Sequence, residues 1–484
     1  MDRNKRQQQI EDALNAQGRT LFWFGPRGSD AMGLRLFHDH FAGSFALYDR
    51  FFPSDTTDTK DNFVALEDLT LKRRLSRAFD EDPDSFPGEY QFRKLLSTAL
   101  KSEIVKGNIP TVIAYEPHAV LETIINQDPI AEFFGNDIHD FRRVSSKPYV
   151  ERALLALGVP VIPWKAIDGY DQVQELANAY SSLIIRRDGG SSGKGIISFR
   201  DGDDEAQVGR EIREMLASHA AVVSASELFE NAVSLNASGV VFPQGGRNKP
   251  IQVATFPVNA QLVGQPQLTS LEFGYSGNDF HFPFGLDNEI LLQCDEILKT
   301  TGQWLGSKGY IGAFGVDLLL TKDGRLFFTE LNARFQGSTR LLSRITGRAG
   351  QSDVLMEHLA ATLGLPFGGT LTAPQWTDEI NPFSQMYLHN VNNVPVSLSQ
   401  SAAPKGSDPN AVANPIASHV EYEMVPDNHD LTIESGALVE RVVVRGSVLS
   451  SDGRTLSDKA KALLQPSLER YEPSLTRDDI VLAR

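Results

Sequence analysis

The stretch from Gly309 to Arg340 reads GYIGAFGVDLLLTKDGRLFFTELNARFQGSTR. Two apolar runs, Phe314–Thr321 and Arg325–Leu331, flank an Asp-Gly pair. This pattern is a strong signal for a β-hairpin, because a two-residue turn needs positive φ at both central positions. We therefore expect Asp323 and Gly324 to be the two loop residues of a hairpin.

The register that follows from this turn gathers three polar side chains on one face. Leu319 then lies opposite Phe328, and Asp317 lies opposite Glu330. Because side chains alternate along a strand, Asn332 shares the face of Glu330. Two facing carboxylates repel, and a cation between them would remove that repulsion; carboxylate and amide oxygens suit Mg²⁺ that carries nucleotide phosphates. The alternative is a solvated acidic pair, and a three-residue loop would separate the pair.

Composition indicates an ordinary globular protein of two to four domains. The chain has 484 residues, 41% of them hydrophobic, and its formal charge of −16 argues against a general nucleic-acid binder. The single cysteine, Cys294, excludes a disulfide framework and is expected to be buried. The first residues are polar, and no apolar run reaches the length of a membrane span. We expect a cytoplasmic protein with no membrane or nucleic-acid partner.

Strands and helices alternate early in the chain, so residues 1–144 are expected to form an α/β layer. Residues 20–25 and 111–115 are predicted strands, and residues 91–105 are a predicted helix. The segment GPRGSDAMG, residues 25–33, is predicted to be a loop, because its glycines miss the spacing of a dinucleotide-binding turn.

The rest of the chain is expected to be α+β. Residues 145–380 would form one domain, and residues 381–484 a small C-terminal domain that could close over the site. Residues 272–283 are predicted to be an irregular loop that shields the site from water. The predicted strands are 183–187, 196–200, 222–229, 233–241, 251–259, 384–389, 418–424 and 437–444, and the predicted helices 150–157, 171–181, 206–219, 288–308, 352–363 and 456–471.

A glycine-rich loop lies in IIRRDGGSSGKGI, residues 184–196, between two predicted strands. Glycines let backbone N–H groups approach phosphate oxygens, and serine hydroxyls and a lysine add donors and charge. It is not a P-loop, because one residue is missing, no helix follows at once, and Gly195 stands at the magnesium-binding position. The alternative is a mobile surface hairpin. The residues expected to lie on a triphosphate are Gly190, Ser191, Ser192, Gly193 and Lys194.

Together these spacings resemble those of the ATP-grasp ligases, over about Ser145 to Leu365. Lys147, followed eleven residues later by Gly158-Val-Pro, is similar to the opening of that family's ATP-binding domain, where the lysine contacts the α-phosphate. The family's second phosphate lysine falls on Arg186, which departs from the usual pattern, and Arg187 is the alternative. The resemblance implies an ATP-grasp fold behind a Rossmann-like pre-ATP-grasp layer.

The resemblance also implies roles for the remaining site residues. It gives Asp317, Glu330 and Asn332 to one or two Mg²⁺ ions that accompany ATP. The adenine would be held by Glu227, Leu228 and Phe229, with Glu230 as a candidate ribose contact; the catalytic residues would be Arg334, Lys194 and, as a second choice, Arg340; the substrate would meet Arg334, Gln336, Ser338 and Tyr275. Two alternatives stay open, a surface ion pair for Arg340 and helix capping for Ser338.

The reaction implied by the resemblance joins a carboxylate to an amine. ATP phosphorylates the carboxylate, ADP leaves, and the amine displaces phosphate from the acyl phosphate. The layout resembles stand-alone natural-product ligases of the pheganomycin peptide ligase type. Two alternatives remain: loading of an amino acid onto the thiol of an acyl carrier protein, for which Arg142-Arg143 is a weak hint, and nucleotide-dependent regulation without turnover. The expected partners are a small-molecule or peptide carboxylate and an amine, with a carrier protein or a homodimer as further options.

Overall fold

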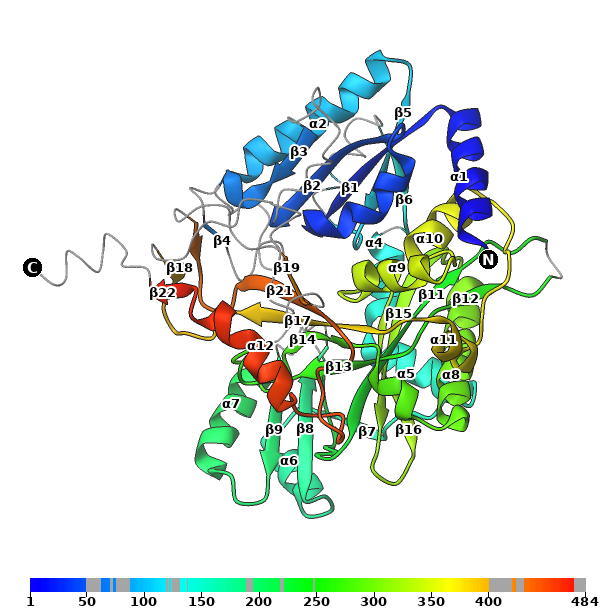
Figure 1. Cartoon of the computed structure of the whole chain (residues 1–484). Coiled ribbons are helices and arrows are strands. Elements are labelled where there is room, and N and C mark those ends of the chain that lie inside the picture. Colours follow the sequence, from blue (N-terminus) through cyan, green and yellow to red (C-terminus); the bar gives the residue numbers. More distant parts are fainter. Residues whose placement is uncertain are drawn as a thin grey trace, which may run out of the picture.

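The computed structural model places an N-terminal layer above a central sheet, with a smaller sheet and the C-terminal helix to one side (Figure 1). Within the described part of the chain, no helix is long and apolar enough to cross a membrane. The described residues are 1–48, 62–69, 73–74, 88–118, 121, 123, 131–136, 138–188, 195–217, 222–246, 249–399, 420–423 and 431–473.

The N-terminal layer is a parallel sheet with the strand order β3-β2-β1-β5-β6. Parallel neighbours need crossover connections, which the alternating strand and helix signals provide. Its core is aromatic, with Phe22, Phe45 and Phe92 fully buried. The predicted α/β layer is confirmed, with strands β1 Arg19–Arg27, β2 Phe41–Tyr48, β3 Phe63–Ala65, β5 Ile109–Ala114 and β6 Glu132–Phe134, and helices α1 Arg3–Gln17 and α2 Glu89–Val105.

A separate antiparallel sheet carries the two strands that flank the glycine-rich loop. Its order is β7-β10-β8-β9, and its core is built around Leu183, Ile185 and Val223. Helices α6 and α7 pack on it. We call these elements the lid sheet: β7 Trp164–Ile167, β8 Ser182–Arg187, β9 Ile196–Arg200 and β10 Val223–Glu227, with α6 Tyr170–Ala177 and α7 Glu205–Ala217.

The central sheet has nine strands and runs from the predicted hairpin into the C-terminal part of the chain. Its order is β16-β15-β11-β13-β14-β17-β21-β19, with β12 beside β11. The boundary expected near residue 381 therefore falls within one continuous sheet. The strands are β11 Val233–Val241, β12 Val253–Thr255, β13 Asn259–Val263, β14 Tyr275–Asp279, β15 Gly312–Leu320, β16 Leu326–Asn332, β17 Phe383–His389, β19 Val420–Glu423 and β21 Leu438–Arg445.

Helices cover the central sheet, and a small sheet of order β22-β18-β20-β4 lies at its C-terminal end. The buried residues of helix α8 include Cys294, as expected for an apolar side chain. The helices are α4 Ile138–Ser145, α5 Lys147–Ala156, α8 Asn288–Ser307, α9 Thr339–Arg348, α10 Val354–Thr362, α11 Ala373–Glu379 and α12 Asp458–Leu468; the small sheet holds β4 Arg73–Arg74, β18 Val396–Leu398, β20 Thr432–Ile433 and β22 Tyr471–Pro473.

Three local predictions are wrong. The loop predicted at residues 25–33 ends strand β1 and continues as the 3-10 helix η1, Gly28–Phe37. The strand predicted at residues 251–259 is divided into β12 and β13. The irregular loop predicted at residues 272–283 contains β14, which pairs with β13 and β17. There Gly277 has a φ of +142° and lies too close to a backbone carbonyl to carry a side chain. A glycine inside a strand weakens the strand pattern of the sequence, so this segment resembles a loop.

A buried ion pair joins helix α1 of the N-terminal layer to helix α10, which packs between that layer and the central sheet. Arg6 donates from Nε and Nη2 to the two carboxylate oxygens of Glu357, at 3.0 and 2.8 Å. The two side chains are only 0% and 3% exposed. Arg6 also donates to the carbonyl of Pro366, so three separate parts of the chain meet at one guanidinium.

Candidate functional site

The hairpin brings Asp317 opposite Glu330, as predicted. It does so in a different register, because Leu319 pairs with Phe327. The predicted pairing of Leu319 with Phe328 is therefore wrong. The expected two-residue turn is wrong for the same reason.

Two local irregularities cancel within the hairpin. The loop has three residues, closed by the Thr321 N–H donating to the Arg325 carbonyl at 2.9 Å, with Gly324 at a φ of +83°. This loop shifts the register by one residue. A β-bulge then places the extra residue Thr329 in β16 and restores the facing position of Asp317.

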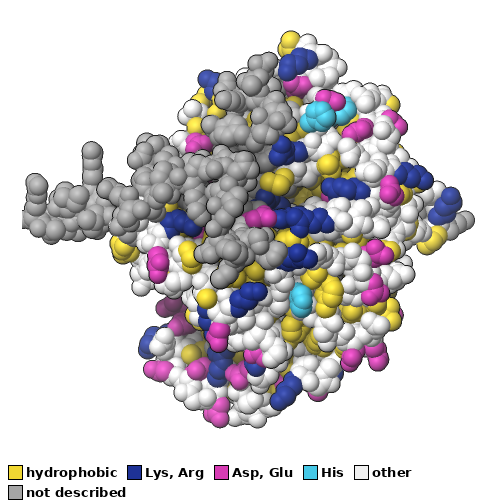
Figure 2. All heavy atoms as spheres, in the orientation of Figure 1, with side chains coloured by type: hydrophobic (Ala, Val, Ile, Leu, Met, Phe, Trp, Pro, Cys, Tyr) yellow, Lys and Arg dark blue, Asp and Glu magenta, His cyan; other side chains and the backbone are white. Residues whose placement is uncertain are grey.

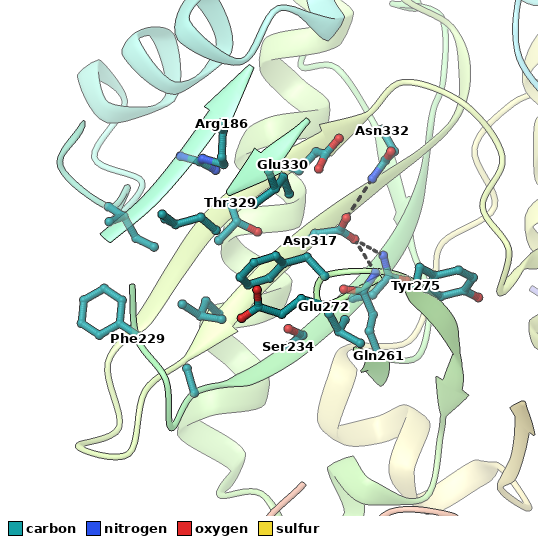
Figure 3. A pocket seen from close by; sticks show the side chains of 18 of the residues that line it. Arg186, Phe229, Ser234, Gln261, Glu272, Tyr275, Asp317, Thr329, Glu330 and Asn332 are labelled. Carbon is teal, nitrogen blue, oxygen red and sulfur yellow. Dashed lines mark hydrogen bonds between the residues drawn. The ribbon is translucent and has the colours of Figure 1, made fainter. Parts of the chain in front are cut away.

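A cavity of about 530 Å³ lies where the central sheet, the lid sheet and the N-terminal layer meet. Figure 3 shows side chains of the hairpin, the lid sheet and the neighbouring strands converging on it. The predicted site residues that line it are Lys147, Arg186, Glu227, Leu228, Phe229, Glu230, Tyr275, Asp317, Glu330, Asn332, Arg334, Gln336 and Ser338.

The carboxylate of Asp317 is held by three amide side chains. Its Oδ1 accepts from Asn236 at 2.6 Å and from Gln261 at 3.0 Å, and its Oδ2 accepts from Asn332 at 3.1 Å (Figure 3). Burial, with the nearby charge of Glu330 as a second cause, raises the pKa of Asp317 to about 6. A cation at this position would favour the ionised carboxylate and so offset both causes of the raised pKa.

One of these amides begins a row that crosses the central sheet. Asn236 accepts from Asn259 at 3.2 Å, and Asn259 accepts from Asn278 at 2.7 Å. Asn278 in turn accepts from Gln385 at 2.8 Å. The side-chain N–H groups of all four point toward Asp317, and each amide comes from a different strand.

The predicted metal ligands fit a hard cation. Lys147 Nζ lies 3.3 Å from Glu330 Oε2, so a cationic group already faces one of the two carboxylates. Among the described residues, no three His, Cys, Asp or Glu side chains are grouped to hold a metal unaided. The trio of Asp317, Glu330 and Asn332 offers two carboxylates and one amide oxygen, which suits Mg²⁺ that takes its remaining ligands from phosphate and water.

Arg186 faces the cavity from strand β8, whereas the adjacent Arg187 is exposed on the other side. Arg186 Nη2 lies 3.5 Å from Glu151 Oε1, and both side chains are buried. Burial raises the pKa of Glu151, although the charge of Arg186 acts against that shift. Between the two alternatives left by the sequence, the geometry favours Arg186 as the phosphate contact.

The hinge residues close one end of the cavity. The backbone N–H of Leu228 donates to Ser182 of the lid sheet at 3.0 Å. The ring of Phe229 stacks on Phe327, next to the loop of the hairpin. Glu230 is paired with Arg200, with Oε1 and Nε 2.8 Å apart. This end is mainly apolar and edged by polar groups, as an adenosine site requires.

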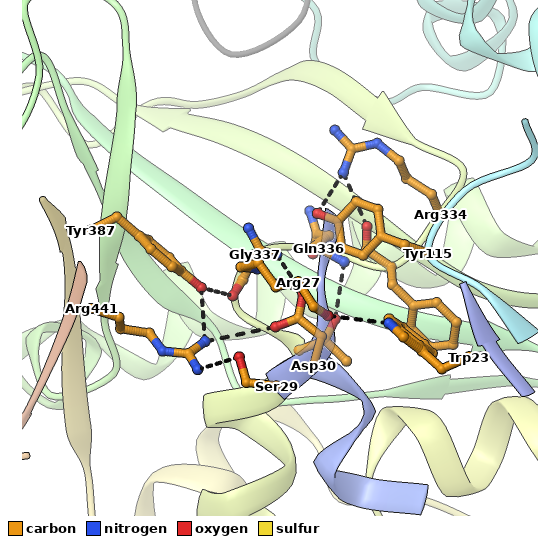
Figure 4. A network of polar contacts seen from close by, with 12 residues as sticks. Trp23, Arg27, Ser29, Asp30, Tyr115, Arg334, Gln336, Gly337, Tyr387 and Arg441 are labelled. Carbon is orange, nitrogen blue, oxygen red and sulfur yellow. Dashed lines mark hydrogen bonds and ion pairs between the residues drawn. The ribbon is translucent and has the colours of Figure 1, made fainter. Parts of the chain in front are cut away.

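The opposite end of the cavity is rich in polar groups. Arg334 Nη1 donates to the hydroxyl of Tyr115 at 2.9 Å (Figure 4). Its Nε lies 3.1 Å from Glu116 Oε2. Burial opposes the charge of Arg334, but Tyr115 and Glu116 outweigh it and raise its pKa. Gln336 accepts from a buried serine hydroxyl, Ser238, at 2.7 Å.

Two further predicted residues of this end are also in place. The hydroxyl of Tyr275 donates to Asn278. Ser338 occupies the N-cap position of helix α9, but its buried Oγ makes no hydrogen bond with any described residue and so does not cap the helix.

The structure does not bring every predicted residue to the cavity. Arg340 does not line it, and among its contacts is Met32 of the N-terminal layer. Its position in the first turn of α9 turns the side chain away from the strands that form the site. The predicted phosphate loop, Gly190, Ser191, Ser192, Gly193 and Lys194, lies outside the described residues.

Sequence reasoning missed several residues of the cavity wall. Arg27 and Tyr115 lie at the carboxyl ends of the neighbouring parallel strands β1 and β5. Ligands bind at this edge in such sheets. That rule could have identified them, once the two strands were assumed to be neighbours. Gln261 and Asn236 carried no signal, because they contact Asp317 only through the pairing of β11 with β13 and β15.

Comparison with known families agrees with this geometry. Residues 144–338 match a family profile described as the ATP-grasp domain. This part of the chain has the ATP-grasp fold. The matched segment begins just before Lys147 and ends at Ser338, so it includes the lid sheet and the hairpin. No curated protein matches the chain.

Solved structures with an ATP-grasp fold resemble almost the whole chain. The biotin carboxylase domain of the Hydrogenobacter thermophilus 2-oxoglutarate carboxylase, solved as a dimer with MgADP, ADP and bicarbonate, has 13% identity and a TM-score of 0.60, covering 95% of this chain and 91% of its own. A Campylobacter jejuni biotin carboxylase with bound β-γ-ATP has 14% identity and a TM-score of 0.59, covering 95% and 93%.

A third solved structure covers the chain to a similar extent. The Staphylococcus aureus N5-carboxyaminoimidazole synthetase with bound ADP has 11% identity and a TM-score of 0.52, covering 94% of this chain and 97% of its own. At such identities the likeness shows the fold, and the ATP-grasp fold expected from the sequence is confirmed.

Proposed function

We propose that the protein is an ADP-forming ligase that joins a carboxylate to an amine through an acyl phosphate. The observation that supports this is the meeting, in one cavity, of a carboxylate pair, two cationic side chains and a further, half-buried arginine. These are Asp317 with Glu330, Lys147 with Arg186, and Arg334. Phosphoryl transfer needs positioning and charge stabilisation more than covalent chemistry, and this set provides both.

The nucleotide would lie between the lid sheet and the hairpin. The hinge around Leu228 and the ring of Phe229 would hold the adenine, and Lys147 and Arg186 would contact the phosphates. Mg²⁺, held by the trio defined above, would neutralise phosphate charge when bound. These contacts would leave the γ-phosphate directed toward the polar end of the cavity.

The polar end would orient the acid. A carboxylate oxygen attacks the γ-phosphorus, and the bond to the β-phosphate oxygen breaks to release ADP. The amine nitrogen then attacks the acyl carbon, loses a proton, and expels inorganic phosphate. Arg334 would hold the carboxylate and then the acyl phosphate, because its planar fork suits both. The half-buried setting of Arg334, whose side chain is 22% exposed, would limit contact between water and the intermediate.

The narrower form that we favour is ligation of the peptide type in natural-product biosynthesis. Its test is a phosphate-release screen that pairs amino acids and other acids with a panel of amines in the presence of Mg-ATP. The expected result is ADP formation that depends on both partners, with an amide product of matching mass. ADP formation only with a phosphopantetheine thiol would contradict the amine assignment.

A hairpin variant tests the metal role separately from the fold. Glu330→Ala should abolish ADP formation and weaken Mg-ATP binding in calorimetry, while the melting temperature stays near that of the wild type. Asp323→Ala, in the loop of the same hairpin and exposed, is the matched control and should keep both properties. Undiminished activity of the Glu330 variant would overturn the proposed site.

A further inference from the structure

One wall of the cavity comes from the N-terminal layer and carries a cation that the proposed reaction does not use. Arg27 is the last residue of strand β1, and it lines the polar end. The indole N–H of Trp23 donates to its carbonyl at 3.2 Å, which fixes the backbone at this point (Figure 4). The guanidinium is therefore held in the wall by a rigid element.

Part of the hydrogen-bonding capacity of Arg27 is unused, and its Nη2 is buried. Its Nε donates to Asp30 Oδ2 at 2.7 Å. Its Nη2 also lies 2.7 Å from that oxygen, in an ion pair without hydrogen-bond geometry. Within the described part of the chain, Nη1 has no partner. The side chain is only 12% exposed, and a buried guanidinium with unused donors is costly unless a ligand accepts from it.

Two aromatic rings restrict how a ligand can reach this guanidinium. Its carbon lies 5.5 Å from the centroid of Tyr115 and 5.3 Å from that of Tyr387. Figure 4 shows Arg27 between these two residues. Because the rings occupy the space around the guanidinium, a ligand must approach along its edge. Because Nη2 is buried against Asp30, a carboxylate oxygen would accept from Nη1, in a charge-assisted hydrogen bond.

A second guanidinium lies within reach of the same substrate. Arg334 contacts the same Tyr115 ring, at 5.3 Å from its centroid, so the two guanidinium carbons are less than about 11 Å apart. Arg334 is the residue assigned above to the reacting carboxylate. A small molecule can span this distance and meet both arginines.

We propose that Arg27 binds a second, non-reacting carboxylate carried by one of the two substrates. The inference rests on the proposed ligase function and narrows its substrate class. The carboxylate belongs either to a dicarboxylic acid, whose other end reacts at Arg334, or to an amino acid that serves as the amine. Both sources present the same group to the same edge of Arg27.

The test measures binding, so it does not depend on turnover. Calorimetry in the presence of Mg-ADP compares each carboxylate with its amide: glutarate with glutaramate on the acid arm, and alanine with alaninamide on the amine arm. In wild type we expect the carboxylate to bind about tenfold more tightly or better on one arm. The arm that discriminates identifies the source of the second carboxylate.

Three variants assign the discrimination to Arg27. In Arg27→Gln the affinities for the carboxylate and its amide should differ by no more than about twofold. Arg27→Lys, which keeps the ion pair with Asp30, should keep part of the preference for the carboxylate. The matched control is Arg152→Gln, because Arg152 also lies over an aromatic ring, Trp164, but is exposed and outside the cavity. The control should behave as wild type.

Several results would overturn the inference. Wild type that binds each amide as well as its carboxylate, or Arg27→Gln that weakens both equally, would show that Arg27 does not read a carboxylate. The melting temperatures of both Arg27 variants show whether the fold survives, and Arg27→Lys decides the matter if the glutamine variant unfolds. If discrimination persists but no acid and amine pair yields ADP, the proposed reaction fails and the binding site stands.

Discussion

Two arginines adjacent in the sequence face different surroundings. Arg186 is buried beside Glu151 and lines the cavity, whereas Arg187 is exposed. The alternation of side chains along strand β8 is sufficient to separate them. The sequence alone left either arginine as the phosphate contact, and their different surroundings allow the two to be compared as matched variants.

We expect Arg186→Met to weaken Mg-ATP binding by about tenfold to a hundredfold, because a charged hydrogen bond to phosphate is lost. Arg187→Met, the neighbouring control, should bind as wild type. Calorimetry gives both constants. Since the first variant leaves Glu151 buried without its partner, Arg186→Met combined with Glu151→Gln should restore stability but not affinity. Equal losses in the two methionine variants would refute the assignment.

A buried histidine should make stability depend on pH. Burial lowers the pKa of His358 to about 4, and the ring accepts from the N–H of Ala313 at 3.0 Å. Its ordinary pKa is about 6.5 in the unfolded chain. Between pH 6.5 and 4 the imidazole is protonated in the unfolded chain but not in the folded chain. The contribution of His358 to the free energy of unfolding is therefore complete above pH 6.5 and is lost as the pH decreases toward 4.

The expected loss from this group is about 3 kcal/mol over that window. His358→Gln should flatten the corresponding part of a curve of unfolding free energy against pH, measured with denaturant. The comparison of the two curves removes the contribution of other titrating groups. Parallel curves for wild type and variant would show that His358 does not titrate in this way.

At the scale of elements, the sequence predicts strands well where apolar runs are uninterrupted. Strand β11 has its predicted bounds, Val233–Val241, because it is buried along almost its whole length. Strand β14 was missed, because Gly277 and its polar neighbours hide a strand that exists only through pairing on both sides. Pattern within one segment cannot reveal pairing between segments.

The hairpin and the cavity wall show the same limit. The facing of Asp317 and Glu330 was predicted from an incorrect turn, and Thr329 compensated for the error. Arg27 and Tyr115 could not be joined to the site, because their meeting depends on the order of strands in the N-terminal sheet. Motif residues were predictable, and residues contributed by other layers were not.

Alanine substitutions at two glycines of the hairpin should have different effects, one on kinetics and the other on stability. In Gly315→Ala the new Cβ would lie 1.9 Å from Cδ of Gln336 and displace that side chain from the cavity. We expect kcat/KM for the acid to fall by about tenfold to a hundredfold, with ATP binding unchanged. Gly324→Ala meets no atom within 4 Å but has a φ of +83°, so it should cost about 1 kcal/mol of stability and leave kinetics unchanged.

Steady-state kinetics and thermal unfolding on both variants check this pair. Unchanged kinetics in the Gly315 variant would mean that Gln336 does not contact the acid. Slower turnover in the Gly324 variant would mean that the loop of the hairpin takes part in the reaction.

At the scale of the whole molecule, a buried charge pair attaches the N-terminal layer to helix α10, which packs on the central sheet. Arg6→Met should destabilise the protein by about 3 to 5 kcal/mol, because Glu357 is left buried without a counter-ion. The double variant Arg6→Met with Glu357→Leu should recover most of the loss. Denaturant unfolding of the three proteins measures this. A double variant no more stable than Arg6→Met would contradict the explanation.

The row of amides that ends at Asp317 has a consequence for how the two ends of the cavity communicate. Reversing one amide would place an N–H group against another N–H group. The carboxylate of Asp317, which can only accept, therefore sets the orientation of every amide in the row. At its tail, Gln385 also donates to the carbonyl of Gly337, next to the substrate groups. A divalent ion bound at Asp317 would thus fix the amide orientation four strands away, beside the groups proposed to hold the acid, without any movement of the backbone.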